Sequence, residues 1–243
     1  MRKFLSFFLI GLASTVHASD LYFSNFDGPN CINGAMVKSK LLSFQRYSSN
    51  RELWDKLHSI QCKSVGLNDL IMGDIGIIID HGPHALPNII SHAFVFLDNQ
   101  SSFEKHGWAK SEAYQTVNTL NILEEYGVSN DGDVRVEYFR CISQRNFINI
   151  HTNKINRTVL DLYKKILSLE QIHYQISQGN SVDDHKSKFI EFYNTIKNDL
   201  LILNQVKLTD VDRLIVNDIA NRLDSFRLSR LIEFSVSPKS AGI

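Results

Sequence analysis

A histidine and a glutamate have the types and spacing of the base and the acid in a catalytic triad. His92 opens an apolar segment over 93–97, and Glu104 follows twelve residues after it, beyond a polar turn at 98–102. The apolar segment favours a strand, and Asp98-Asn99 is a hairpin-turn signal. Because strand side chains alternate, an even separation in a plain hairpin can place His92 and Glu104 on one face. An imidazole beside a carboxylate can act as a general base that the acid orients.

Cys31 is the candidate nucleophile for this pair. It follows an Asp-Gly-Pro-Asn turn and precedes a segment, 32–42, that can form a helix, so the thiol lies at a predicted helix N-terminus. The helix macrodipole and the free N–H groups at that end favour a thiolate. Backbone amides there can also face a developing oxyanion, and Asn30 is the candidate oxyanion residue.

The other two cysteines suit a structural role. In an exported protein, two of three cysteines are expected to pair and the third is a free thiol. Cys62 follows the end of a predicted helix over 49–60, and Cys141 lies late in a predicted strand over 134–142. We therefore predict a disulfide between Cys62 and Cys141, which leaves Cys31 free.

The first eighteen residues read as a secretory signal peptide. Arg2 and Lys3 precede an apolar run and a small-residue exit at Val16-His17-Ala18, which predicts cleavage after Ala18 and a secreted or periplasmic protein. Loss of Arg2 and Lys3 lowers the basic residues from 26 to 24, against 26 acidic ones, a net charge of −2. This balance does not favour nucleic acid as a partner, and no later apolar run is long enough for a stable membrane span.

Several histidines raise the alternative of a metal site. Four of them fall near the predicted hairpin: His81, His84, His92 and His106. A His-x-x-His on an irregular loop is a weak zinc signal, and neither a Cys pair nor a His-Glu-x-x-His motif accompanies it. We therefore predict neither a metal nor another cofactor.

The hydrophobic period changes to a helical one near Asn149. Apolar residues then recur at steps of three and four along three amphipathic segments, with Ser181 and Thr209 as candidate caps. The pattern divides the chain into a signal peptide at 1–18, a first domain at 19–145 and a separable helical bundle or hairpin at 151–235. Partly heptad-like spacing leaves a helical partner or self-association as alternatives to a bundle within one chain.

Three motifs together resemble the NlpC-type papain-like cysteine peptidases. They are Asn30-Cys31 at a helix start, Gly73-Asp74-Ile75-Gly76 before a strand, and His92-Ala-Phe-Val-Phe-Leu97 with a polar residue twelve positions after its histidine. The resemblance covers 27–142. It implies an α+β fold with a papain-like core, in which the cysteine helix packs on an antiparallel sheet and the C-terminal helices are an addition. It also implies an exported thiol hydrolase of amide bonds, with cell-wall stem peptides as the typical substrates.

Glu104 departs from the histidine, asparagine or glutamine that the family usually has at the third position. A glutamate is more similar to relatives that include lipid-acyl hydrolases and transferases, so an acyl ester or lipid amide is the alternative substrate. Those relatives often have a permuted order with the cysteine last, which would nominate Cys141, although its strand context argues against that role. A third reading is a catalytically silent papain-like scaffold that binds a partner through its helices.

Overall fold

The computed structural model describes residues 29–82, 89–107, 112–129, 132–177 and 182–227. The predicted signal peptide, His84 and the candidate cap Ser181 lie outside these ranges. Among the helices within them, none is long and apolar enough to cross a membrane.

The first half of the chain forms a six-stranded sheet in which every pair of neighbouring strands is antiparallel. The spatial order is β1-β6-β2-β3-β4-β5. The strands are β1 (Cys62–Val65), β2 (Ile75–Asp80), β3 (Ile90–Phe96), β4 (Ser101–Lys105), β5 (Tyr114–Asn118) and β6 (Val134–Cys141). Strands β2 and β3 are central and almost wholly buried, because helices cover both faces of the sheet.

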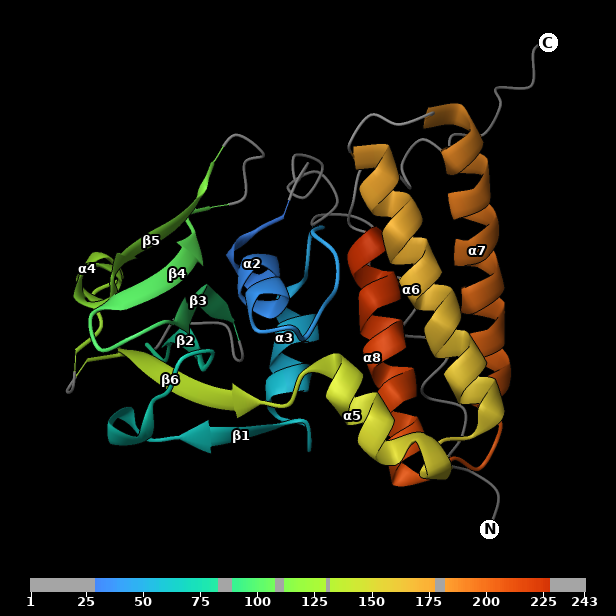
Figure 1. Ribbon diagram of the computed structural model, residues 1–243, viewed down its shortest axis with the longest axis horizontal. Coiled ribbons are helices and arrows are strands. Elements are labelled where there is room, and N and C mark those ends of the chain that lie inside the picture. Colours follow the sequence, from blue (N-terminus) through green and yellow to red (C-terminus); the bar gives the residue numbers. More distant parts are fainter. Residues whose placement is uncertain (1–28, 83–88, 108–111, 130–131, 178–181, 228–243) are drawn as a thin grey trace.

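Two short helices, α2 (Cys31–Lys38) and α3 (Asn50–Leu57), lie between the sheet and the C-terminal helices (Figure 1). Their apolar side chains share one core with alternate residues of β2 and β3. Helix α4 (Thr119–Glu125) packs through Ile122 in a smaller core with Phe94 of β3. Since side chains alternate along a strand, these two cores lie on opposite faces of the sheet.

Local sequence explains the ends of α2. The side chain of Asn30 accepts a hydrogen bond from the backbone N–H of Asn33, which is a helix N-cap. At the other end Lys40 has a positive φ of 63°, and Leu41 N–H donates to the carbonyl of Met36. This is a Schellman motif, which is usually built on glycine, and it ends the helix at Lys38, earlier than the predicted 42.

The Gly73-Asp74-Ile75-Gly76 motif shapes the turn into β2. Gly73 has a φ of 98°, which a side chain would strain, and Asp74 accepts hydrogen bonds from Ile71 N–H and from the Arg140 guanidinium. A side chain at Gly76 would overlap the ring of Phe94. The motif therefore allows β3 to pack closely beside β2.

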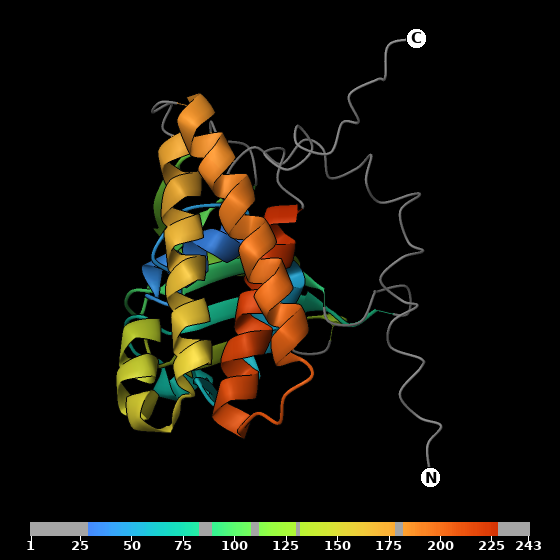
Figure 2. The same cartoon turned by 90° about the vertical axis from the view of Figure 1, so that its right-hand side faces the viewer.

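The second half of the chain is helical. It contains α5 (Gln144–His151), α6 (Arg157–Ser177), α7 (Val182–Leu203) and α8 (Asp210–Arg227), and short 3-10 turns occur at Leu67–Asp69 and Thr152–Lys154. Figure 2 shows the three long helices side by side, in front of the sheet. They bury a core of their own that includes Val159, Ile166, Ile196 and Ile219. This agrees with the helical period of the sequence beyond Asn149.

Buried charges join the helices to the first half of the chain. Arg46, which follows α2, binds Glu52 of α3 and Glu170 of α6, at 2.8 and 2.9 Å. Arg222 of α8 lies 3.3 Å from Glu170, and the side chains of Arg46, Glu52, Glu170 and Arg222 are at most 1% exposed. These four residues are called the junction cluster below.

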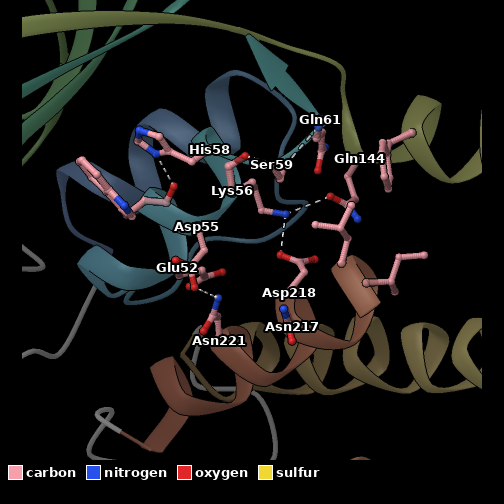
Figure 3. A pocket seen from close by; sticks show the side chains of 14 residues that line it. Glu52, Asp55, Lys56, His58, Ser59, Gln61, Gln144, Asn217, Asp218 and Asn221 are labelled. Atoms are coloured by element: carbon pink, nitrogen blue, oxygen red, sulfur yellow. Dashed lines mark hydrogen bonds and ion pairs between the residues drawn. The ribbon is translucent and has the colours of Figure 1, made fainter. Parts of the chain in front are cut away.

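Figure 3 shows the neighbouring contacts between α3 and α8, around a pocket of about 300 Å³. Lys56 Nζ lies 2.6 Å from Asp218 and donates to Gln144 at 3.0 Å, while Asn221 donates to Asp55. Whether residues 151–235 fold as a separate unit stays a prediction.

A disulfide joins Cys62 and Cys141, which agrees with the pairing that the sequence favoured. Cys62 is the first residue of β1 and lies directly opposite Cys141 of β6, whereas the sequence placed it at the end of a helix. That helix, α3, ends at Leu57, and the chain needs only a short turn before β1 begins. Cys31 is a free, partly exposed thiol.

Candidate active site

His92 and Glu104 meet in the structure. Nε2 of His92 lies 2.6 Å from Oε2 of Glu104, and the two residues are 0% and 3% exposed. They come from neighbouring strands, β3 and β4, in which Phe94 pairs with Glu104. Gln115 of β5 donates to the other carboxylate oxygen at 2.7 Å. Burial raises the pKa of Glu104, but hydrogen bonds from His92 and Gln115 outweigh it, so the pKa lies below its ordinary value.

Cys31 lies near enough to His92 to change its titration. Burial alone would lower the pKa of the imidazole, but its interactions with Cys31 and with Glu104 raise that pKa to about 9. Because Glu104 occupies Nε2, a proton exchanged with the thiol would pass through Nδ1, which the Tyr126 hydroxyl also approaches. The three predicted residues therefore lie together, with the thiol at the start of α2 and the base beside its carboxylate.

Asn30 is engaged in local structure. Besides capping α2, its side-chain amide donates to the carbonyl of Ser48 at 2.8 Å. Asn33, one turn along the helix, donates to the Ser48 hydroxyl and accepts from Arg46 N–H. These bonds tie the start of α2 to the segment that carries Arg46, and through Arg46 to the junction cluster. An oxyanion role for the Asn30 side chain stays a prediction.

Tyr126 was not among the predicted site residues. It is the C-cap of α4, its hydroxyl lies 3.0 Å from His92 Nδ1, and its ring stacks on the imidazole with centroids 4.6 Å apart. The sequence carries no signal that the end of this helix lies beside His92. That placement depends on how α4 packs through Ile122.

Lys105 was also not among the predicted site residues, and it lies close to the thiol. It is 1% exposed, and burial lowers its pKa while the charges of Glu112 and Cys31 raise it. Its Cβ lies on the side of the sheet that carries α2, next to Gly34. The electrostatic interaction of Lys105 with Cys31 shows that the two side chains lie near each other.

A groove runs along α2 from a point one turn beyond Cys31. It has a volume of about 740 Å³. Its walls are mainly apolar and belong to α2, β3, β4, β5 and the turn before β2; they include Val37, Met72, Val95, Leu97, Phe103 and Tyr114. Lys38 and Lys40 lie along its edge, and the Lys38 ammonium is 4.5 Å from the centre of the Phe103 ring. Gly34 and Lys38 are three and seven residues after Cys31, so they lie on the helix face that carries the thiol.

The histidines considered for zinc do not converge in the described part of the chain, where no group of three or more His, Cys, Asp or Glu side chains could hold a metal ion. His106 instead lies 3.5 Å from Glu125 at the surface. No family model, curated protein or solved structure matches this chain.

Proposed function

We propose that this protein is an exported thiol hydrolase with a papain-like core, which cleaves amide bonds through Cys31, His92 and Glu104. The observation that carries the proposal is the 2.6 Å contact between buried Glu104 and His92, together with the influence of Cys31 on the same imidazole. A helix start that carries a cysteine, beside antiparallel strands that carry the histidine and the acid, supports the papain-like assignment. The Cys62–Cys141 disulfide supports an oxidising compartment.

The chemistry follows from these positions. Sγ of Cys31 attacks the carbonyl carbon as a thiolate, and Nδ1 of His92 gives its proton to the leaving nitrogen as the C–N bond breaks. Water then attacks the thioester, its proton passes to Nδ1, and the C–S bond breaks to release the acid. Glu104 keeps the imidazole oriented and stabilises its cation throughout.

The test is digestion of muropeptides by wild type and by Cys31→Ala, followed by mass spectrometry of the products. We expect wild type to shorten the stem peptides and Cys31→Ala to leave them intact, with the same melting temperature. Labelling by iodoacetamide at neutral pH is a second readout, since a thiolate beside an imidazolium alkylates faster than an ordinary thiol. Slow labelling of Cys31 and intact muropeptides would favour the catalytically silent scaffold.

The groove along α2 favours a second candidate, a hydrolase of acyl esters or lipid amides that uses the same three residues. Its apolar walls begin one turn from Cys31, and two lysines lie at its edge, where an anionic head group would be attracted. Hydrolysis of p-nitrophenyl butyrate and dodecanoate distinguishes this candidate. We expect it to prefer dodecanoate, and Val37→Phe, which narrows the groove, to remove that preference while butyrate hydrolysis persists. Leu120→Ala, at an exposed position on α4, is the control.

A further inference from the structure

The imidazole of His92 is bound at both nitrogens. Glu104 occupies Nε2 at 2.6 Å, and the Tyr126 hydroxyl lies 3.0 Å from Nδ1. Because Glu104 is held as a carboxylate, Nε2 carries a hydrogen, and in the neutral ring Nδ1 is an acceptor. Burial raises the pKa of Tyr126 above its ordinary value, and the charges of Cys31 and Glu125 raise it further. The phenol therefore stays protonated and donates to Nδ1.

We propose that Tyr126 is a positioning residue that makes the His92 imidazolium a stronger acid by donating a hydrogen bond to Nδ1 of the neutral ring. In the imidazolium Nδ1 carries its own hydrogen, which Cys31 accepts, so the hydroxyl stabilises the neutral imidazole more than the cation. Glu104 acts in the opposite direction, because its negative charge stabilises the cation. The Tyr126 hydroxyl thus offsets part of the increase in His92 basicity that the charge of Glu104 causes.

The catalytic consequence rests on the proposed function. An imidazolium must lose its proton to the leaving group, and acid–base catalysis works best when the pKa lies near the working pH. His92 has a pKa of about 9 in the presence of Cys31 and Glu104, which makes its cation a weak acid at neutral pH. A hydrogen bond that favours the neutral ring speeds this proton transfer.

The charged and titratable groups around the pair come from α2, β4 and α4 and from residues that follow β4 or precede β5. Cys31 of α2 and Glu104 of β4 face the imidazole. Glu125 of α4 and Glu112, which precedes β5, act on Tyr126 together with Cys31 and Glu104. His106 acts on Glu104 and contacts Glu125. All of these except Cys31 are unchanged in the variants used below.

The experiment is an NMR titration of His92 in protein that contains ¹³C-labelled histidine, with the resonance assigned through His92→Gln. Tyr126→Phe keeps the stacked ring and removes only the hydroxyl. We expect it to raise the His92 pKa by about 0.5 to 1 unit, which is the effect of one hydrogen bond. Tyr114→Phe is the matched control, since the buried hydroxyl of this partly exposed tyrosine has no hydrogen-bond partner among the described residues. It should leave the pKa unchanged.

The titration is repeated in the Cys31→Ala background, where the hydroxyl can also accept from Nδ1–H of the cation, and a smaller upward shift is expected. An unchanged or lowered His92 pKa in Tyr126→Phe would overturn the proposal. Biosynthetic 3-fluorotyrosine provides a second measurement, because a more acidic phenol is a stronger donor and should lower the pKa. None of these readouts needs a substrate, so they can succeed even where the proposed hydrolysis fails.

With a turned-over substrate, Tyr126→Phe should lower kcat at pH 7 by about 3- to 10-fold, leave KM unchanged and move the optimum to higher pH. A change in KM alone would show that Tyr126 contacts the substrate instead, and would overturn the positioning role.

Discussion

Two buried histidines in this protein have opposite pKa shifts. Burial of the ring is the largest influence on both and lowers the pKa in each case. At His92, Cys31 and Glu104 outweigh burial and raise the pKa to about 9. At His173 of α6, burial is reinforced by the positive charge of Arg46 and the pKa falls to about 4. Burial thus keeps a histidine neutral by lowering its pKa. Anionic neighbours raise the pKa of a buried histidine and so allow it to act as a base.

The anions near His173 have other partners. Glu170 and Glu52 both bind Arg46, and Glu170 also faces Arg222, so these carboxylates are neutralised by arginine. The His173 ring lies instead between aromatic rings, with Phe226 at 5.2 Å between centroids. The junction cluster contains no nucleophile. Its role is to hold the helices against the first half of the chain.

The largest expected effect comes from breaking the junction cluster. Glu170→Ala leaves Arg46 and Arg222 buried with one carboxylate fewer, and removal of one partner from a buried pair typically costs about 3–5 kcal/mol. Urea unfolding monitored by circular dichroism measures this loss. Lys164→Ala is the control on the same helix, because Lys164 and Asp161 form an exposed pair worth at most about 1 kcal/mol. Equal stability of the two variants would show that the buried charges contribute little.

The second prediction concerns a truncated chain that ends after Arg145 and lacks the three long helices. It would lose Glu170 and Asp218, the partners of Arg46 and Lys56, and would expose the surface of the first half that the long helices cover. We expect such a chain to be insoluble, although the change of hydrophobic period alone suggested that the helices can be removed. A soluble, cooperatively folding product would instead support the separable helical domain.

The contrast between the two regions also shows what could be predicted from the sequence. The start of α2 and the hairpin that carries His92 and Glu104 depend on turn and strand signals within a few residues, and both were predicted; the Asn30 cap was not. The even spacing of twelve residues then sufficed to bring the base and the acid together.

The remaining features depend on contacts between distant segments. Arg46 and Glu170 are 124 residues apart, and nothing in either local pattern selects the other as a partner. Tyr126 reaches His92 only because α4 packs on the face of the sheet opposite to α2. The early end of α2 at Lys38 could not be predicted either, because its Schellman motif has a lysine where glycine is usual.

The next prediction concerns Glu104, the carboxylate beside His92, and its effect on stability is smaller than that of Glu170→Ala. Glu104→Gln keeps a hydrogen-bond acceptor but removes the charge that raises the His92 pKa. We expect turnover to fall by about 10- to 1000-fold, the range for losing a charge-stabilising partner. Wild-type turnover in a well-folded variant would remove Glu104 from the proposed triad.

The same variant should change how stability depends on pH. A folded pKa of about 9, above the unfolded value near 6.5, stabilises the protein fully below pH 6.5. That contribution, up to about 3 kcal/mol, is lost as the pH rises through 9. Urea midpoints measured between pH 6 and 10 should therefore fall more steeply in wild type than in Glu104→Gln. Parallel curves would contradict the raised pKa.

The smallest effect is expected at His173 and lies at acid pH. Its folded pKa of about 4 is below the unfolded value, so the unfolded chain binds a proton between pH 6.5 and 4 that the folded chain does not. Wild type should therefore lose stability on acidification, by about 2 kcal/mol at pH 5 relative to pH 7 from this residue alone. His173→Leu has a similar volume and no proton to gain, and the buried Nδ1 that it removes has no partner among the described residues. We expect this variant to match wild type at pH 7 and to exceed it at pH 5, with guanidinium midpoints at both pH values as the measurement. If the two proteins lose stability in parallel, His173 already accepts a proton in the folded state, and burial is not sufficient to keep this histidine neutral.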